Sequence, residues 1–136
     1  MSKSPLDRYI AVLPSSVPIL GLEFPISYEI NLRDADDSVL YGDLDRSTKR
    51  IRIAIRPPAQ MRRVLLHEMF HGIMLQSGWY ELLKAIAVDH AEEGLNSLIE
   101  ENLGPYVTFI DTIWPEKKID KVYESVREEI EGLIAP

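Results

Sequence analysis

The sequence predicts a single α+β domain over residues 1–136, in which a small antiparallel or mixed three-stranded sheet precedes a set of helices. Two patterns support this prediction. In the first half of the chain, apolar and polar residues alternate with a period of two, which is typical of strands with one buried face. In the second half, apolar residues recur at helical spacing. The two halves follow each other without a linker, and 136 residues suffice for one core.

The three strands are expected at about residues 26–32, 39–43 and 50–55. The first and the third alternate most clearly, and the third places its isoleucines on one side and its arginines on the other. An Asp-rich turn follows the first strand, and a polar turn precedes the third. The start of the chain is interrupted by several prolines, so the first element is expected at residue 26.

Four helices are expected to follow, at about residues 59–76, 81–102, 106–114 and 118–134. Pro57-Pro58 ends the sheet and suits the first turn of the first helix, and Gly78 is a suitable stop for it. The last helix has the clearest pattern. Its apolar residues recur at helical spacing, at Ile119, Val122, Tyr123, Val126, Ile130 and Leu133.

His67, Glu68 and His71 form an H-E-x-x-H motif within an apolar run that favours a helix. Residues four apart lie on one helical face, so the two imidazoles point toward the same place. This is the geometry that Zn²⁺ needs from two of its protein ligands. Glu68 follows about 100° around the helix. There it can reach a metal-bound water without being a ligand, which is the position of a general base.

The motif is improbable as a coincidence. The chain has only 3 histidines in 136 residues, and the composition alone gives the motif with a chance on the order of one per cent. A helix that served only the core would more often place Leu or Ala at these positions, because a buried imidazole needs partners for its nitrogens. We therefore predict a metal site. Zn²⁺ is the expected ion, although Mn²⁺, Co²⁺ or Ni²⁺ could occupy the same ligands.

A catalytic zinc site needs a third protein ligand, and the candidates lie in the helix expected at 81–102. Helical phase favours Glu92, which flanks the apolar stripe of that helix, over Glu93, which points further round. His90 is the alternative, as a third imidazole. A metal site completed by a glutamate from a following helix resembles the gluzincins.

The resemblance extends beyond the motif. Residues 41–45, the basic turn after them and the H-E-x-x-H helix together look like small metallopeptidases of phages and prophages. Those proteins are related to the ImmA/IrrE-type gluzincins, some of which cleave a transcriptional repressor. The likeness covers roughly residues 26–103, and only the H-E-x-x-H motif is specific. Leu95 precedes Asn96 where the family has a Glu-x-x-Ala-Asn-type run, so the chain departs from the family pattern there.

The resemblance implies a zinc metallopeptidase with a minimal zincin-like fold, acting on a peptide or protein. His67, His71 and Glu92 would hold Zn²⁺ and leave one position for a water. Glu68 would act as the general base on this zinc-activated water and would deliver its proton to the leaving amine. Zincins usually bind an extended peptide along an exposed strand edge. The strand at 50–55 is the expected edge, and its arginines would then favour acidic substrates.

Charge and composition narrow the class of partner. The net charge of −7 argues against general nucleic-acid binding. Seven of the 15 basic residues lie within residues 46–63, and we interpret them mainly as the solvated face of a strand. With no cysteine, the chain has no disulfide and no thiolate ligand. No apolar run approaches the about 20 residues that span a bilayer, and the start of the chain lacks a signal-peptide pattern. We expect a cytoplasmic protein with no membrane partner.

Two other classes of function remain open at this stage. The site could bind zinc without chemistry, in a regulatory or phage-host interaction module, where the metal contributes folding energy alone. A closed fourth position, filled for example by His90, would favour that module. A DNA-associated protease related to SprT-like proteins would need the basic stretch to form a continuous groove, and the overall acidity counts against it.

Overall fold

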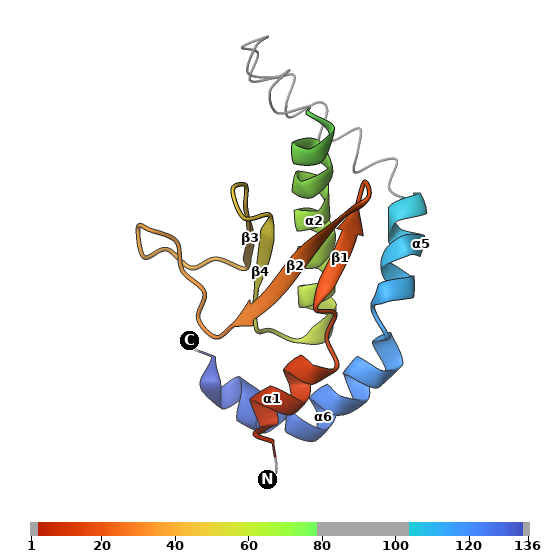
Figure 1. Cartoon of the computed structure of the whole chain (residues 1–136). Helices are drawn as coiled ribbons and strands as arrows, with labels where there is room; N and C mark the ends of the chain where they lie inside the picture. The colour runs from red at the N-terminus through yellow and green to blue at the C-terminus, as the bar shows by residue number, and fades with distance from the viewer. Residues whose placement is uncertain (1–2, 79–103, 135–136) are drawn as a thin grey trace.

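The computed structural model describes residues 3–78 and 104–134, and it has the predicted α+β class (Figure 1). The elements in chain order are α1 (Pro5–Ala11), β1 (Ser16–Ile19), β2 (Leu22–Glu29), β3 (Gly42–Asp45), β4 (Arg50–Ala54), α2 (Pro58–Ser77), α5 (Gly104–Ile113) and α6 (Glu116–Leu133). The sheet has 4 strands, so the prediction of three is wrong. The helix predicted at 81–102 lies outside the described residues.

The four strands form one mixed sheet in the order β1-β2-β4-β3. β1 and β3 pair antiparallel with their neighbours, and β2 pairs parallel with β4. The prediction that the strand at 50–55 forms an exposed edge is therefore wrong, because β4 lies inside the sheet. β3 turns back along the outer side of β4, which makes β3 the edge strand on that side.

β1 is the strand that the sequence did not predict. It pairs with β2 through a two-residue turn at Leu20 (φ +48°) and Gly21 (φ +84°). Two positive φ angles are typical of the type I′ turn, whose twist matches that of the flanking strands. Glycine adopts this conformation readily and leucine does not, so the turn gives a weak sequence signal. Pro18 is tolerated because β1 is an edge strand.

β2 changes its partner halfway along its length. Its first half pairs with β1 as far as Ser16↔Pro25, and its second half pairs with β4 from Ile26↔Ile51 onward. Pro25, which has no amide hydrogen, lies at the end of the first pairing. The strand therefore begins earlier than residue 26.

β3 also differs from its prediction, because it covers Gly42–Asp45 and not residues 39–43. Val39 forms an isolated antiparallel bridge with Arg33. The amide of Leu40 donates to the carbonyl of Leu32 at 3.0 Å. Residues 39 and 40 thus pair with the loop that precedes them, and pairing with β4 begins at Gly42.

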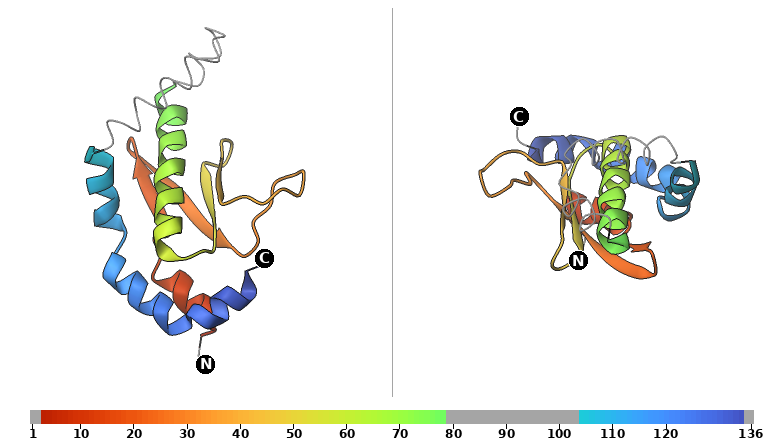
Figure 2. Two further views of the ribbon diagram at one scale, coloured as in Figure 1. Left: turned by 180° about the vertical axis from the view of Figure 1, so that it is seen from behind. Right: turned by 90° about the horizontal axis from the view of Figure 1, so that it is seen from above.

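α2 covers one face of the sheet (Figures 1 and 2). It begins at Pro58, directly after Pro57, and ends at Gly78, whose φ of +82° is the left-handed conformation common after helices. Both ends agree with the prediction. The fully buried side chains between helix and sheet include Met61, Leu65, Ile51, Ile53 and Phe24.

α1 and α6 pack together at the end of the sheet where α2 begins (Figure 1). The unpredicted α1 starts at the N-cap Ser4, whose hydroxyl accepts from the amide of Asp7 at 3.1 Å. Tyr9 is fully buried and lies 5.2 Å from the ring of Tyr123. Its hydroxyl donates to the carbonyl of Arg56 at 2.8 Å.

α6 agrees with the helix predicted at 118–134, and α5 with the short helix predicted at 106–114, each within a few residues. The predicted apolar stripe of α6 is buried at Ile119, Tyr123, Val126 and Ile130. Leu133, the last residue of this pattern, is 46% exposed. Within residues 3–78 and 104–134, no helix combines the length and the apolar character needed to cross a membrane.

Two glycines let the sheet approach α2 closely. A Cβ atom on Gly42 of β3 would overlap Cγ1 of Val64 and would lie 3.1 Å from the carbonyl oxygen of Arg52. A Cβ atom on Gly72 of α2 would lie 2.5 Å from Cδ1 of Ile19. The helix thus packs closely against β3 on one side and against the β1–β2 hairpin on the other.

We predict that Gly42→Ala destabilises the fold by about 1–3 kcal/mol, because the added methyl meets a β-branched side chain on a helix and a backbone oxygen. Gly132→Ala is the matched control. It makes the same change in α6, where nothing lies within 4 Å, and it should stabilise by up to about 1 kcal/mol through helix propensity. Urea unfolding of both variants would check the prediction. Equal stability of the Gly42 variant and wild type would contradict it.

Candidate metal centre

α2 brings His67, Glu68 and His71 together in the middle of its length. One potential ligand atom from each of the three side chains lies within 4.8 Å of the others. The two imidazole rings meet edge to face, with centroids 4.7 Å apart. The helix thus gives the clustering that the spacing predicts. The assignment of His67 and His71 as ligands stays a prediction.

The distance between the histidines fits a metal ion. Nε2 of His67 and Nε2 of His71 lie 3.0 Å apart. Two Zn–N bonds of about 2.0–2.1 Å at a tetrahedral angle hold their nitrogens about 3.3 Å apart. A movement of a few tenths of an ångström would therefore place both nitrogens on one ion. In the metal-free state, one ring can donate a hydrogen bond to the other.

Glu68 differs sharply from the two histidines in its exposure. Glu68 is 5% exposed, whereas His67 is exposed and His71 is half-buried. Burial, together with the nearby negative charge of Asp43, raises the pKa of Glu68 from 4.5 to about 7. A carboxyl group with this pKa can both accept and release a proton near neutral pH.

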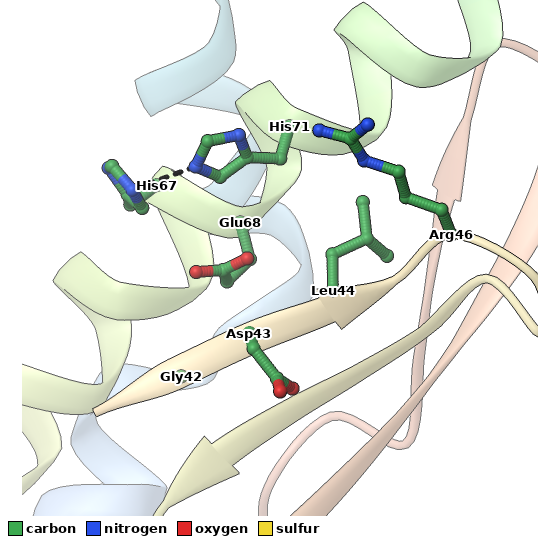
Figure 3. Close-up of a pocket in the computed structure, with 7 residues that line it drawn as sticks. All are labelled: Gly42, Asp43, Leu44, Arg46, His67, Glu68 and His71. Carbon is green, nitrogen blue, oxygen red and sulfur yellow. Dashed lines mark hydrogen bonds between the residues drawn. The ribbon is translucent and has the colours of Figure 1, made fainter. Parts of the chain in front are cut away.

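Asp43 lies below Glu68 on β3, but its carboxylate points away from the histidines (Figure 3). It accepts a hydrogen bond from Nε of Arg52 at 2.8 Å and a second one from Nη2 of Arg52. Arg52 also lies 3.7 Å from Glu29. Asp43 is therefore committed to an ion pair between β3 and β4, and it is not a third ligand in this arrangement.

A cavity of about 320 Å³ opens between α2 and the edge strand β3. Its lining comprises Gly42, Asp43, Leu44, Arg46, His67, Glu68 and His71. Arg46, which directly follows β3, extends past Leu44 toward the part of the site that contains His71 (Figure 3). The candidate metal centre thus has His67, Glu68 and His71 on the helix side and the edge strand β3 on the opposite side.

The predicted third ligands, Glu92, Glu93 and His90, all lie outside the described residues. The sequence did not predict that residues of β3 and of the turn after it lie beside the motif. Residues 41–45 contributed to the family resemblance, but nothing in their sequence indicates that they face a helix more than 20 positions later. Only the strand order, with β3 at the edge, brings them to the motif.

Comparisons with known proteins identify no relative of this chain. No protein-family model matches the chain, and neither the curated proteins nor the solved structures include a match.

We predict that Glu68→Gln makes the metal-free protein more stable at high pH but not at low pH. The folded-state pKa of Glu68 is raised to about 7. Folding therefore keeps a proton that the unfolded chain loses, and wild-type stability falls as the pH rises from about 4.5 to about 7. Glutamine has no such loss, so its advantage should grow by up to about 3 kcal/mol over that range.

Urea unfolding in the presence of a chelator, at about pH 5 and about pH 8, measures this difference. Glu128→Gln, on the exposed face of α6, is the matched control and should show no such change. A pH-independent difference between wild type and Glu68→Gln would contradict the prediction.

Proposed function

We propose that this chain is a zinc-dependent metallopeptidase of the H-E-x-x-H type. One observation carries the proposal. A buried carboxyl group, Glu68, lies beside two imidazole nitrogens that are 3.0 Å apart, in a cavity bordered by a strand edge. A site that served only to stabilise the fold would not need a buried acid at this position.

His67 and His71 supply two of the ligands in this proposal. Glu92 remains our proposed third ligand, with Glu93 and His90 as the alternatives. When bound, Zn²⁺ would polarise a substrate carbonyl and would lower the pKa of a water, so that hydroxide is available for attack near neutral pH. Beside a bound cation, Glu68 would be held in its ionised form, which is the form that accepts a proton.

Glu68 moves the proton in both halves of the reaction. It takes one proton from water while the water oxygen bonds to the carbonyl carbon of the peptide. It then gives this proton to the amide nitrogen as the C–N bond breaks, so the products are a carboxylic acid and an amine. The hydrophobic surroundings that raise its pKa keep the donation step favourable.

β3 is the strand that would hold the substrate. It is an edge of the sheet and lines the cavity opposite the motif. Its outer side can pair with an extended peptide through main-chain hydrogen bonds, as in β-augmentation. This assignment replaces the expectation that β4 performs this role. The substrate would then cross the site directly above Glu68.

The family, the cellular location and the substrate class are part of the same proposal. The motif and residues 41–45 support kinship with the phage and prophage metallopeptidases of the ImmA/IrrE type. A chain without cysteine is compatible with the cytoplasm. The acidic net charge supports a protein substrate over a nucleic acid.

The decisive experiment measures zinc content and proteolysis together in wild type, Glu68→Gln and His67→Ala. We expect about one zinc per chain in wild type and Glu68→Gln, and a loss of bound zinc in His67→Ala. Cleavage of an unfolded protein should fall by at least about 100-fold in Glu68→Gln. Glu128→Gln should retain both zinc and activity.

Two outcomes would overturn this proposal. Stoichiometric zinc without cleavage in any variant would favour the non-catalytic zinc-binding module. Failure to bind zinc, either after purification without chelators or on addition of zinc, would refute the metal centre itself.

A further inference from the structure

Two cavities meet at the candidate catalytic residues. The first is the cavity of about 320 Å³ that contains Arg46. The second has a volume of about 430 Å³ and lies toward the loop before β3. They share Gly42, His67 and Glu68. Because β3 begins at Gly42, one cavity follows the strand forward and the other extends backward along the chain.

The first cavity, which we call the basic cavity, carries a positive charge from Arg46. Figure 3 shows its guanidinium reaching over Leu44 on the same side of the strand as the motif. Two acids share this lining: Asp43 is turned away and paired with Arg52, and Glu68 lies on the helix side of the cavity. The basic cavity therefore has a guanidinium beside the strand edge, in a protein whose net charge is −7. A carboxylate is the ligand that a guanidinium recognises best.

The second cavity, which we call the apolar cavity, is lined mainly by hydrophobic side chains. They are Val39, Leu40, Tyr41 and Val64, with Arg63 at the same wall. Among the described residues, the large hydrophobic side chains that are exposed include Val39 at 50% and Tyr41 at 52%. The guanidinium of Arg56 lies 5.6 Å from the ring centroid of Tyr41 and helps to hold it in place. Clustered exposed apolar side chains beside a site indicate a place where a ligand is bound.

We propose that the site selects peptides that carry an acidic residue on one side of the cleaved bond and an apolar residue on the other. The inference rests on the proposed function and deepens it by naming the substrate class. A peptide paired with β3 runs along both cavities, because both border Gly42. An extended peptide advances about 3.3 Å per residue, so both selected residues lie within about three positions of the bond.

Arg46→Glu tests the basic cavity, and Arg50→Glu is its matched control because Arg50 is exposed and lines neither cavity. The substrates are two peptides that share a leucine on one side of the cleaved bond and carry either glutamate or lysine on the other side. Each peptide is made in two versions, with the leucine before or after the bond. We expect wild type to prefer glutamate by at least about 10-fold in kcat/KM and Arg46→Glu to reverse this preference. Arg50→Glu should match wild type.

Val39→Asp tests the apolar cavity at a half-exposed side chain whose replacement has little packing cost. Leu20→Asp makes the same kind of change at the β1–β2 turn, where the side chain is 59% exposed. We expect the preference for leucine over serine in the peptide to fall by at least about 5-fold in Val39→Asp. Leu20→Asp should keep the wild-type preference.

Binding of the same fluorescent peptides to zinc-loaded Glu68→Gln, followed by anisotropy, separates this inference from the proposed function. Cleavage by wild type with no preference between the peptides would overturn the inference alone. Selective binding without cleavage by wild type would overturn the peptidase and support the two cavities. Neither binding nor cleavage of any of the peptides would overturn both.

Discussion

The close packing of α2 between the two edges of the sheet is the constraint on which the site depends. Gly42 lets β3 approach the helix beside Val64, and Gly72 lets the helix approach Ile19. Because β3 lies this close, water is excluded from Glu68 while the imidazole of His67 remains accessible. One helix thus presents an accessible imidazole and a shielded acid at neighbouring positions.

The burial of Glu68 has an energetic cost, which packing elsewhere in the fold offsets. A buried acid with a raised pKa lowers stability at neutral pH in the metal-free protein. The nearby charge of Asp43 would add to that cost, but Arg52 pairs with it and limits the repulsion. The stability needed to tolerate such a site comes from the apolar core that α2 forms with Ile51, Ile53 and other buried residues.

The part of the site that is local in sequence could be predicted, and the part that depends on strand order could not. α2 follows from Pro57-Pro58, the apolar run and Gly78, and the clustering of its histidines follows from helical spacing. β1 escaped prediction because its turn places Leu20 at a positive φ, without the usual Asn-Gly signal. The role of β3 as the edge beside the motif depends on a parallel pairing between β2 and β4, which no local pattern specifies.

That parallel pairing also separates contacts that form locally from contacts that join distant parts of the chain. The β1–β2 hairpin closes through two residues, and the β3–β4 hairpin through a turn in which the carboxylate of Asp45 accepts from the amide of Ser47 at 2.9 Å. Each hairpin is a short-range contact, whereas joining β2 to β4 closes a loop of more than 20 residues and is the slower kind of step. The nascent helix can bring its two imidazoles together before the hairpins join, but Glu68 becomes shielded only when β3 docks. The two imidazoles therefore come together through local helix formation alone, whereas the burial of Glu68 depends on a long-range contact.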